Sequence, residues 1–248
     1  MKKIVLLIFV SSIIQSLSAQ SKQFLKGPWV REEKDVKTLV LITDQLISVA
    51  VYNEKEKQFL YTWGGTYVLH SSQLQVQYEW SSNDSNLVNT SSAIDFDIKR
   101  NKLSLGETLS GLEKGVTNHS GDLQGAWIIS GNYIDGVAKK RANPFLPRRT
   151  MKLIVGDYFQ WVSYNVVSKK FFDAGGGKQS HGNGQYNEEI EYFTKTPASI
   201  GKKMNYTYSI SGDDWRHSGQ KSTGGPLDEC WTRRSRIELQ FGITRKKL

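Results

Sequence analysis

The sequence predicts an all-β protein made of two tandem antiparallel units. Three observations predict it: apolar and polar residues alternate along several segments, turn-forming residues separate these segments, and one block of the chain recurs at a constant offset further along the sequence. The chain has 248 residues, 38% of them hydrophobic, which is enough for one large β domain or two small ones. The main alternative is one larger barrel or sandwich built by pairing both halves.

The N-terminus has the pattern of a secretory signal peptide. Lys2 and Lys3 precede an apolar run over residues 4–17, and the small residue Ala19 follows. These features are typical of an exported chain, so we expect residues 1–19 to be removed by cleavage after Ala19. The run is too short for a transmembrane helix, and the sequence has no other long apolar run. We therefore expect a soluble protein, periplasmic or secreted, without a transmembrane segment.

Four segments alternate between apolar and polar residues, and each predicts a strand with one solvated face. Their apolar positions are Leu74, Val76, Tyr78 and Trp80, then Ile94, Phe96 and Ile98, then Met204, Tyr206, Tyr208 and Ile210, and finally Ile237, Leu239, Phe241 and Ile243. Turn-forming residues separate the strands at 82–84, 181–184 and 211–213. The one helix that we expect is short and lies around residues 109–115.

An internal repeat divides the chain into two units. The matching positions, all at the same offset, are Tyr52 and Tyr164, Asn53 and Asn165, Phe59 and Phe171, Gly64-Gly65 and Gly176-Gly177, Glu79 and Glu191, and Trp80 and Tyr192. The Gly-x-Trp motifs at Gly27 and Gly125 are closer together than these pairs, so the second copy has about 14 extra residues, which we expect in a loop over 131–149. We place the seam near residues 118–122, which gives units 21–118 and 119–248.

The stretch Gly175-Gly176-Gly177-Lys178 invites comparison with a phosphate-binding loop. Such a loop needs a glycine, four residues and Gly-Lys-Ser/Thr before a helix. Here Phe172 takes the place of the first glycine, Gln179 follows the lysine, and a strand pattern comes next. The equivalent pair Gly64-Gly65 is not followed by lysine. We therefore predict that these glycines form a β-bulge where a barrel strand bends sharply.

The chain is basic, with a formal net charge of +9 that becomes +7 once Lys2 and Lys3 are removed. The positive residues cluster at Arg148-Arg149, at Arg233, Arg234 and Arg236, and at Arg245-Lys246-Lys247. Export argues against nucleic acid as the partner and leaves anionic polysaccharide as a candidate.

Metal and thiol chemistry have little support in the sequence. Cys230 is the single cysteine, which rules out an intrachain disulfide or a thiolate metal cluster, and we expect it to be a half-buried strand residue. The four histidines, His70, His119, His181 and His217, lack metal-ligand spacing. We predict no metal and no cofactor.

The second unit carries a series of motifs that resembles a known family. They are, in order, Gly125-x-Trp127, Phe159-Gln160-Trp161, Gly175-Gly176-Gly177, Tyr186-x-Glu188-x-Ile190-Glu191, Asp214-Trp215-x-His217-x-Gly219 and Glu229-x-Trp231-x-Arg233. The series is similar to that of exported lipocalin-like (calycin-type) proteins of unknown function from Bacteroidota, here in tandem duplication. The resemblance implies a lipocalin-like antiparallel barrel or meander for residues 119–248 and a degenerate one for 21–118. It also implies that Arg233 lies across Trp127 and closes one barrel end.

The last strand that we predict supplies the candidate ligand site. Odd-numbered residues from Glu229 to Ile243 share one face if no bulge intervenes, and the apolar end of that face must point inward. The carboxylate of Glu229, the indole of Trp231 and the guanidinium of Arg233 would then meet inside the barrel, where an unpaired charge is costly. The candidate ligand-binding residues are Trp161, Tyr164, Trp215, Glu229, Trp231 and Arg233. His217 and Glu229 are the candidate acid and base for catalysis.

The leading functional hypothesis is an exported, non-catalytic protein that binds a small apolar, aromatic or saccharide ligand in a β-barrel pocket. The first alternative is a carbohydrate-active enzyme (a hydrolase, lyase or isomerase) that uses His217 and Glu229. The second is a surface protein that binds anionic polysaccharide. A hollow barrel lined by Trp231 favours ligand binding, an open groove with His217 near Glu229 favours an enzyme, and a filled barrel with a flat basic face favours the polymer.

Overall fold

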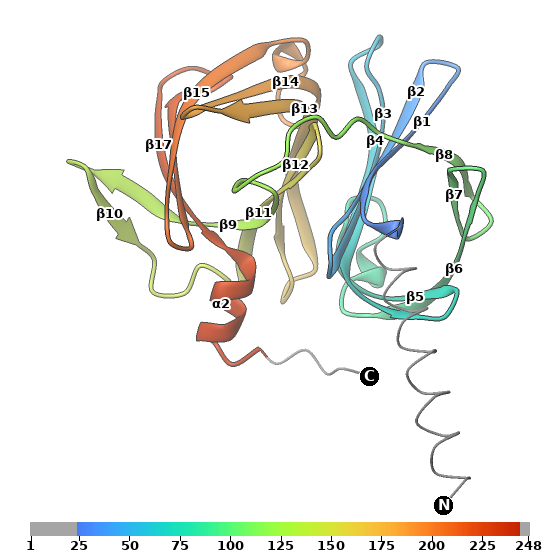
Figure 1. Cartoon of the computed structure of the whole chain (residues 1–248). Coiled ribbons are helices and arrows are strands. Elements are labelled where there is room, and N and C mark those ends of the chain that lie inside the picture. Colours follow the sequence, from blue (N-terminus) through green and yellow to red (C-terminus); the bar gives the residue numbers. More distant parts are fainter. Residues whose placement is uncertain (1–23, 244–248) are drawn as a thin grey trace, which may run out of the picture.

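Two closed antiparallel β-barrels lie side by side in the computed structural model, which describes residues 24–243 (Figure 1). This architecture confirms the all-β fold with two tandem barrel units, and it excludes a single barrel or sandwich shared by both halves. The proposed signal peptide, residues 1–19, and the basic tail at 245–247 lie outside the described residues. Within residues 24–243, no helix is long and apolar enough to cross a membrane.

The first barrel is a meander of eight strands in which each strand pairs with the next and β8 returns to β1. The strands are β1 (Gly27–Glu33), β2 (Val36–Ile42), β3 (Leu46–Asn53), β4 (Gln58–His70), β5 (Gln73–Ser81), β6 (Ser91–Lys99), β7 (Lys102–Leu105) and β8 (Leu109–Lys114). A 3-10 turn, η1 (Ser85–Leu87), connects β5 to β6. Apolar side chains fill most of the interior of this barrel, among them Val40, Ile47, Val49, Leu74, Val76, Leu103 and Leu112.

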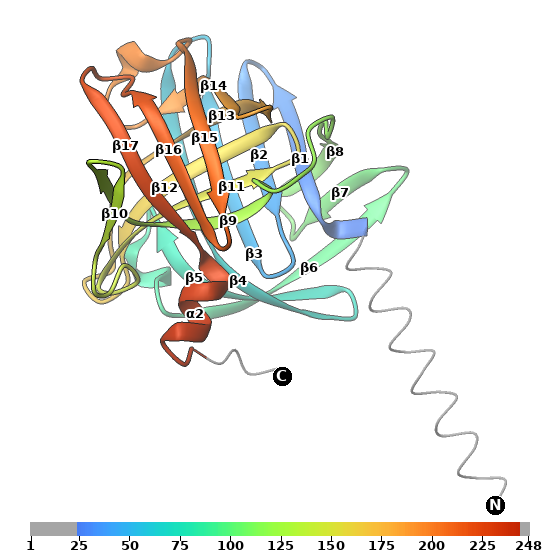
Figure 2. The same cartoon turned by 60° about the vertical axis from the view of Figure 1, so that its left-hand side comes forward.

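The second barrel is also a ring of eight strands, closed by the pairing of β17 with β9. The strands are β9 (Gly125–Ile134), β11 (Arg148–Val155), β12 (Tyr158–Asn165), β13 (Lys170–Gly182), β14 (Gln185–Phe193), β15 (Lys203–Ser211), β16 (Asp214–Gln220) and β17 (Pro226–Arg233). The short strand β10 (Val137–Lys140) pairs only with β9 and lies outside the ring, and η2 (Pro197–Ser199) follows β14. Figure 2 shows α2 (Arg234–Gln240) leaving the end of β17.

Three of the four alternating segments form the strands that the sequence predicts, namely β5, β6 and β15. The fourth does not continue as a strand. β17 ends at Arg233, and the following helix α2 buries Arg234, Ile237 and Glu238, whereas Leu239 is 71% exposed. Spacings of three and four residues between buried positions define a helix face, so the prediction of a strand over 237–243 is wrong.

Two further predictions about local structure need correction. The sequence predicts a short helix around residues 109–115, but residues 109–114 form strand β8. This strand pairs with β7 on one side and with β1 on the other, which closes the ring. The segment 131–149, predicted to be a loop, is partly ordered as a hairpin between the end of β9 and β10. Only residues 141–147 connect β10 to β11. Cys230 is fully buried in β17 rather than half-buried.

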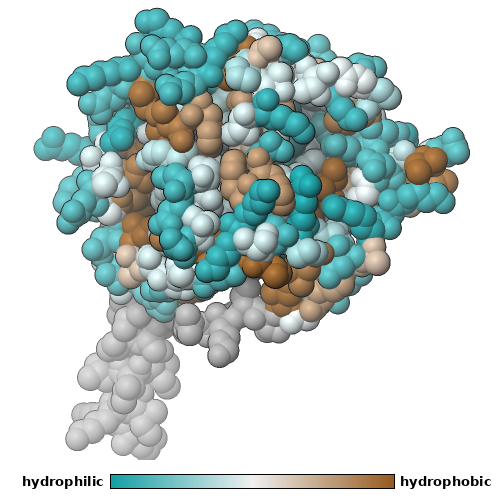
Figure 3. Space-filling model, turned by 180° about the vertical axis from the view of Figure 1, so that it is seen from behind, coloured by the Kyte–Doolittle hydropathy of each residue, from teal (hydrophilic) through white to brown (hydrophobic). Residues whose placement is uncertain are grey.

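The hairpin of β9 and β10 extends beyond the second barrel (Figure 1). Ile134 and Val137, at its tip, are each 55% exposed. Elsewhere on the face shown in Figure 3, apolar groups are scattered among hydrophilic ones. Single exposed apolar side chains are ordinary on a protein surface.

The paired glycines lie at bulges, as the sequence predicts, and the extra residue of each bulge is on the facing strand. On β13 the strand register shifts between Gly176 and Gly177: Gly176 pairs with Tyr192 and Gly177 with Ile190, so Glu191 is the extra residue on β14. The same shift occurs between Gly64 and Gly65 in the first barrel, and there Glu79 is the extra residue on β5. Gly177 has a φ of +154°, and a Cβ there would lie 2.1 Å from the carbonyl oxygen of Glu189. A bulge bends its strand and re-aims the side chains beside it.

The bulges direct side chains of each barrel toward the other. Trp80, which the alternation placed with Leu74, Val76 and Tyr78, instead packs between the barrels and contacts the ring of Tyr164, with 5.3 Å between ring centroids. Tyr52 and Tyr192 make the equivalent contact at 4.6 Å. A shared core of buried residues from both barrels surrounds these rings, including Leu39, Leu41, Leu46, Ile128, Met151, Leu153 and Val162.

The two buried acids at the bulges, Glu79 and Glu191, bind residues of the opposite barrel. Tyr164 donates a hydrogen bond of 2.5 Å to Glu79, and Arg149 forms an ion pair of 2.9 Å with the same carboxylate. The mirror contacts are those of Glu191, which accepts a 2.5 Å hydrogen bond from Tyr52 and pairs with Lys37 at 2.7 Å.

These reciprocal contacts form an interface with approximate two-fold symmetry inside one chain. Tyr52 and Tyr164, Glu79 and Glu191, and Lys37 and Arg149 are each separated by the offset of the sequence repeat. The rings of Phe59 and Phe171, also an equivalent pair, stack on each other with an interplanar angle of 3°. Many of the residues that recur in the sequence repeat are therefore interface residues. They join the two barrels as identical patches join the subunits of a symmetric dimer.

Glu79 also binds a second cation, Arg234 of α2, through two hydrogen bonds, one of them 2.9 Å long. Arg149 and Arg234 are only 8% and 3% exposed. Two arginines that the sequence assigned to basic clusters thus belong to the buried interface and add nothing to a basic surface.

Candidate ligand-binding cavity in the second barrel

The second barrel is hollow. Its cavity has a volume of about 570 Å³, whereas a hollow at one end of the first barrel has about 320 Å³. Residues lining the larger cavity come from every strand of the ring and include Ile129, Thr150, Lys152, Phe159, Trp161, Gly176, Glu188, Ile190, Phe193, Tyr206, His217, Leu227, Glu229 and Trp231. A cavity of this size accommodates a small organic molecule.

Aromatic side chains form much of the cavity wall. Trp161 on β12 packs edge-on against Phe193, with 5.4 Å between ring centroids. It lies over Gly175, where a Cβ would come within 2.7 Å of the indole nitrogen. Trp231 on β17 also lines the cavity. Glycine on the neighbouring strand thus gives the Trp161 ring the space that it occupies.

A buried ion pair lies inside the barrel. Lys152 Nζ is 2.7 Å from Glu188 Oε1, and the side chains are 5% and 6% exposed. The hydroxyl of Tyr186 donates a 2.9 Å hydrogen bond to the same carboxylate oxygen. The Lys152 ammonium is also 5.3 Å from the ring centroids of Tyr186 and Trp231, close enough for cation–π attraction. A buried charge needs such partners, and this pair has them.

His217 and Glu229 face each other across β16 and β17. Glu229 Oε2 is 3.5 Å from His217 Nδ1 and accepts a 3.0 Å hydrogen bond from the indole of Trp231. Burial, reinforced by the charge of Lys152, lowers the pKa of His217. Burial alone would raise the pKa of Glu229, but its contacts with His217 and the charge of Lys152 lower it. At neutral pH the pair is therefore a neutral imidazole beside a carboxylate.

Neither ring nitrogen of His217 has a hydrogen-bond partner within the described part of the chain, although the ring is 2% exposed. A buried polar group without a partner costs roughly 1–3 kcal/mol. The imidazole lines the cavity, so a bound molecule could supply the missing hydrogen bond to a ring nitrogen.

The opposite end of the barrel is closed. The Arg233 guanidinium lies 4.2 Å from the ring centroid of Trp127 and donates hydrogen bonds to the carbonyl oxygens of Gln124 and Asp122. The first barrel has the same arrangement, with Lys114 4.2 Å from the Trp29 ring.

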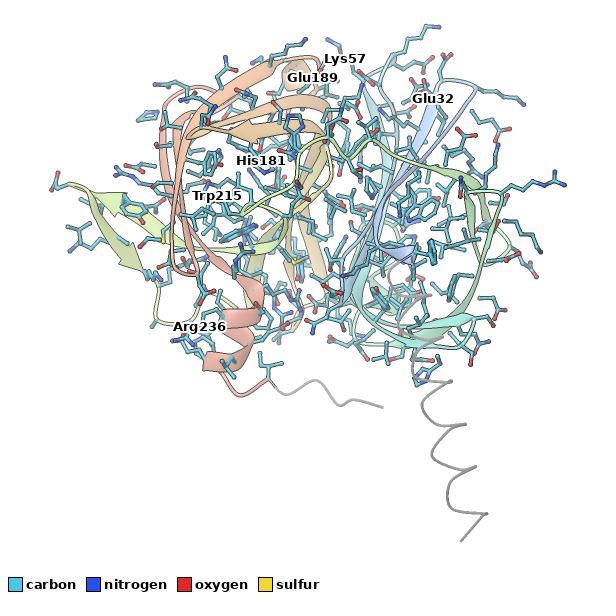
Figure 4. All side chains as sticks on the ribbon, viewed as in Figure 1. Glu32, Lys57, His181, Glu189, Trp215 and Arg236 are labelled. Carbon is cyan, nitrogen blue, oxygen red and sulfur yellow. The ribbon has the colours of Figure 1, made fainter. Side chains whose placement is uncertain are left out.

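We expect Arg233→Ala to lower the free energy of unfolding by about 1–2 kcal/mol, because the cation–π contact and the hydrogen bonds to main-chain carbonyls are lost together. Chemical denaturation would measure the change. Arg236→Ala, an exposed arginine on α2 (Figure 4), is the matched control and should change stability by less than about 0.5 kcal/mol. Equal effects of the two substitutions would contradict this role for Arg233.

The structure brings some of the predicted site residues together and separates others. Trp161, Glu229, Trp231 and His217 line the cavity. Trp215 lies within the second barrel (Figure 4), where it is fully buried, packs on Trp127 and does not line the cavity.

Two other predicted contact residues lie elsewhere. Tyr164 is at the interface between the barrels, and Arg233 closes the far end. Arg233 does not line the cavity with Glu229 and Trp231, because it is the last residue of β17 and its guanidinium lies over Trp127 at the closed end.

Sequence reasoning missed the Lys152–Glu188 pair. A usable signal existed in each strand. Lys152 shares the inward face of its strand with Thr150 and Ile154, and Glu188 shares that of its strand with Tyr186 and Ile190. A charged residue at an inward position of a barrel strand predicts a partner across the interior.

The described residues contain no group of three or more His, Cys, Asp or Glu side chains that could hold a metal ion. Comparison with family models and with curated proteins found no match to this chain.

Proposed function

We propose that the second barrel is a binding site for a small molecule, and that the protein is an exported binding protein of lipocalin-like type. The hollow interior is the observation that carries this proposal. A barrel whose only role is to fold would gain stability from filling 570 Å³ with apolar side chains, as most of the first barrel is filled. The mixture of indole rings with a few polar groups suits an aromatic or saccharide ligand.

Export and family membership are part of the same proposal. They are supported by the signal-like N-terminal sequence and by the Gly-x-Trp motif, whose tryptophan is covered by a cation in both barrels. Secretion assays with the full chain and with a chain lacking residues 2–19 would test export. Retention of the truncated chain inside the cell is the expected result.

Native mass spectrometry of gently purified protein tests for a bound ligand. We expect a co-purified molecule, or binding of an aromatic fluorescent probe, and we expect Trp161→Ala to weaken that binding about tenfold because an aromatic anchor is lost. Trp63→Ala in the first barrel is the matched control and should leave affinity unchanged. Equal affinity of wild type and Trp161→Ala would contradict binding in this cavity.

The distance of 3.5 Å between His217 and Glu229 favours one second candidate, a carbohydrate-active enzyme. A neutral imidazole beside a carboxylate can accept a proton from a substrate hydroxyl. Incubation with mixed oligosaccharides, followed by mass spectrometry of the products, separates the two functions. The enzyme would be established if the wild type turns over an oligosaccharide and the His217→Gln variant still binds it but no longer turns it over. The anionic-polysaccharide hypothesis has less support, because two of its arginines are buried.

A further inference from the structure

The open end of the cavity is lined by cations. Because neighbouring strands run in opposite directions, the start of β11 and the ends of β14 and β16 meet at one end of the barrel. Arg148, Lys195 and Lys221 come from these three places, line the cavity and are exposed. Asp173 is the one acid that lines the cavity apart from the interior carboxylates Glu188 and Glu229.

These three cations do not stabilise the fold through ion pairs. None of them has an ion-pair partner within residues 24–243, whereas other cations of the second barrel, such as Lys140 and Arg216, are paired with Asp214 and Asp228. The Arg148 guanidinium lies 4.3 Å from the ring centroid of Phe172, and its Nε donates a 3.2 Å hydrogen bond to Ser163. The stacking leaves its terminal nitrogens available at the rim.

The interior has the opposite character. Lys152 and Glu188 neutralise each other, so the carboxylate of Glu229 gives the deep part of the cavity a negative charge. An anionic group would be repelled there and attracted at the rim, where low-dielectric walls focus the field of the three cations. The charge pattern thus orients a ligand, with its anionic end outward and a hydrogen-bond donor or apolar end inward.

We propose that the second barrel binds small amphipathic organic anions, with the aromatic or apolar body between Trp161 and Trp231 and the anionic group held at the rim by Arg148, Lys195 and Lys221. This inference rests on the proposed function and specifies its ligand class.

A matched pair of fluorescent probes tests the proposal. 1-Anilinonaphthalene-8-sulfonate carries a sulfonate, and N-phenyl-1-naphthylamine has the same aromatic body without charge. At low ionic strength we expect the anionic probe to bind about tenfold more tightly, and this preference to shrink as salt is added. The triple substitution Arg148→Gln, Lys195→Gln and Lys221→Gln should abolish the preference while leaving the neutral probe bound.

The control variant removes the same charge elsewhere, by Lys57→Gln, Arg100→Gln and Lys139→Gln, and should retain the preference. Equal affinity of the two probes for the wild type, or a preference that survives the rim substitutions, overturns the inference about ligand class but leaves the proposed function standing.

The substitution Leu227→Trp, which fills part of the cavity, should weaken the binding of both probes. If it weakens neither, the cavity is not the binding site and the proposed function fails as well. An anionic polysaccharide that binds the Leu227→Trp variant as tightly as the wild type would assign the cations to polymer binding and overturn the proposal.

Discussion

Glu79→Ala should lower the free energy of unfolding by about 3–5 kcal/mol, the range for removing one partner of a buried ion pair. The substitution leaves Arg149 and Arg234 buried without their shared carboxylate, and it removes the acceptor of the Tyr164 hydroxyl. Denaturation by urea would measure the loss. Glu113→Ala is the matched control, since Glu113 forms an exposed ion pair with Lys102, and it should cost less than about 1 kcal/mol. A loss below about 1 kcal/mol for Glu79→Ala would contradict a role in joining the barrels.

The same carboxylate predicts a pH dependence. Burial alone would raise the pKa of Glu79, but Arg234 and Arg149 outweigh it and hold the pKa well below its usual range. A lowered folded-state pKa contributes stability that is complete above the pKa of an unfolded glutamate, about 4.3, and is lost as the pH falls further. The stability difference between wild type and Glu79→Gln should thus be constant above about pH 5 and decrease below it. A difference that grows on acidification would contradict this assignment.

Gly177→Ala should destabilise the protein by about 3 kcal/mol or more, because the backbone conformation and the available space both exclude a side chain. The φ of +154° is disfavoured for alanine, and the new Cβ would lie 2.1 Å from the Glu189 carbonyl oxygen. The bulge would have to open, and Glu191 would move away from Tyr52 and Lys37.

Gly182→Ala provides the control for this substitution. Gly182 lies on the same strand, and a Cβ there would meet no atom within 4 Å. Its thermal midpoint should equal that of the wild type, whereas Gly177→Ala should unfold at a clearly lower temperature. Equal midpoints for the two variants would show that the bulge does not need glycine.

The interface explains why two barrels are joined in one chain. A ring of about 100 residues buries a limited core, and each barrel covers apolar surface of the other. The aromatic residues of the repeat, Tyr52, Tyr164, Trp80 and Tyr192, lie in this shared core and not in the cavity.

The sequence by itself determined the features that depend on local geometry. Side chains alternate along any strand, so the period-two pattern predicted β5, β6 and β15, and paired glycines in both copies predicted the bulges. The constant offset between matching residues revealed the duplication. Motifs and alternation predict four site residues that line one cavity, namely Trp161, His217, Glu229 and Trp231.

The tertiary structure alone decided which barrel is hollow and which residues face its interior. A bulge reverses the faces of the residues beyond it, so Trp80 faces the other barrel, and Arg233, at the end of β17, covers Trp127 at the closed end. Lys152 and Glu188 meet because closure of the ring brings β11 opposite β14. The local pattern indicates that an inward charge needs a partner, but which residue supplies it depends on contacts between distant segments.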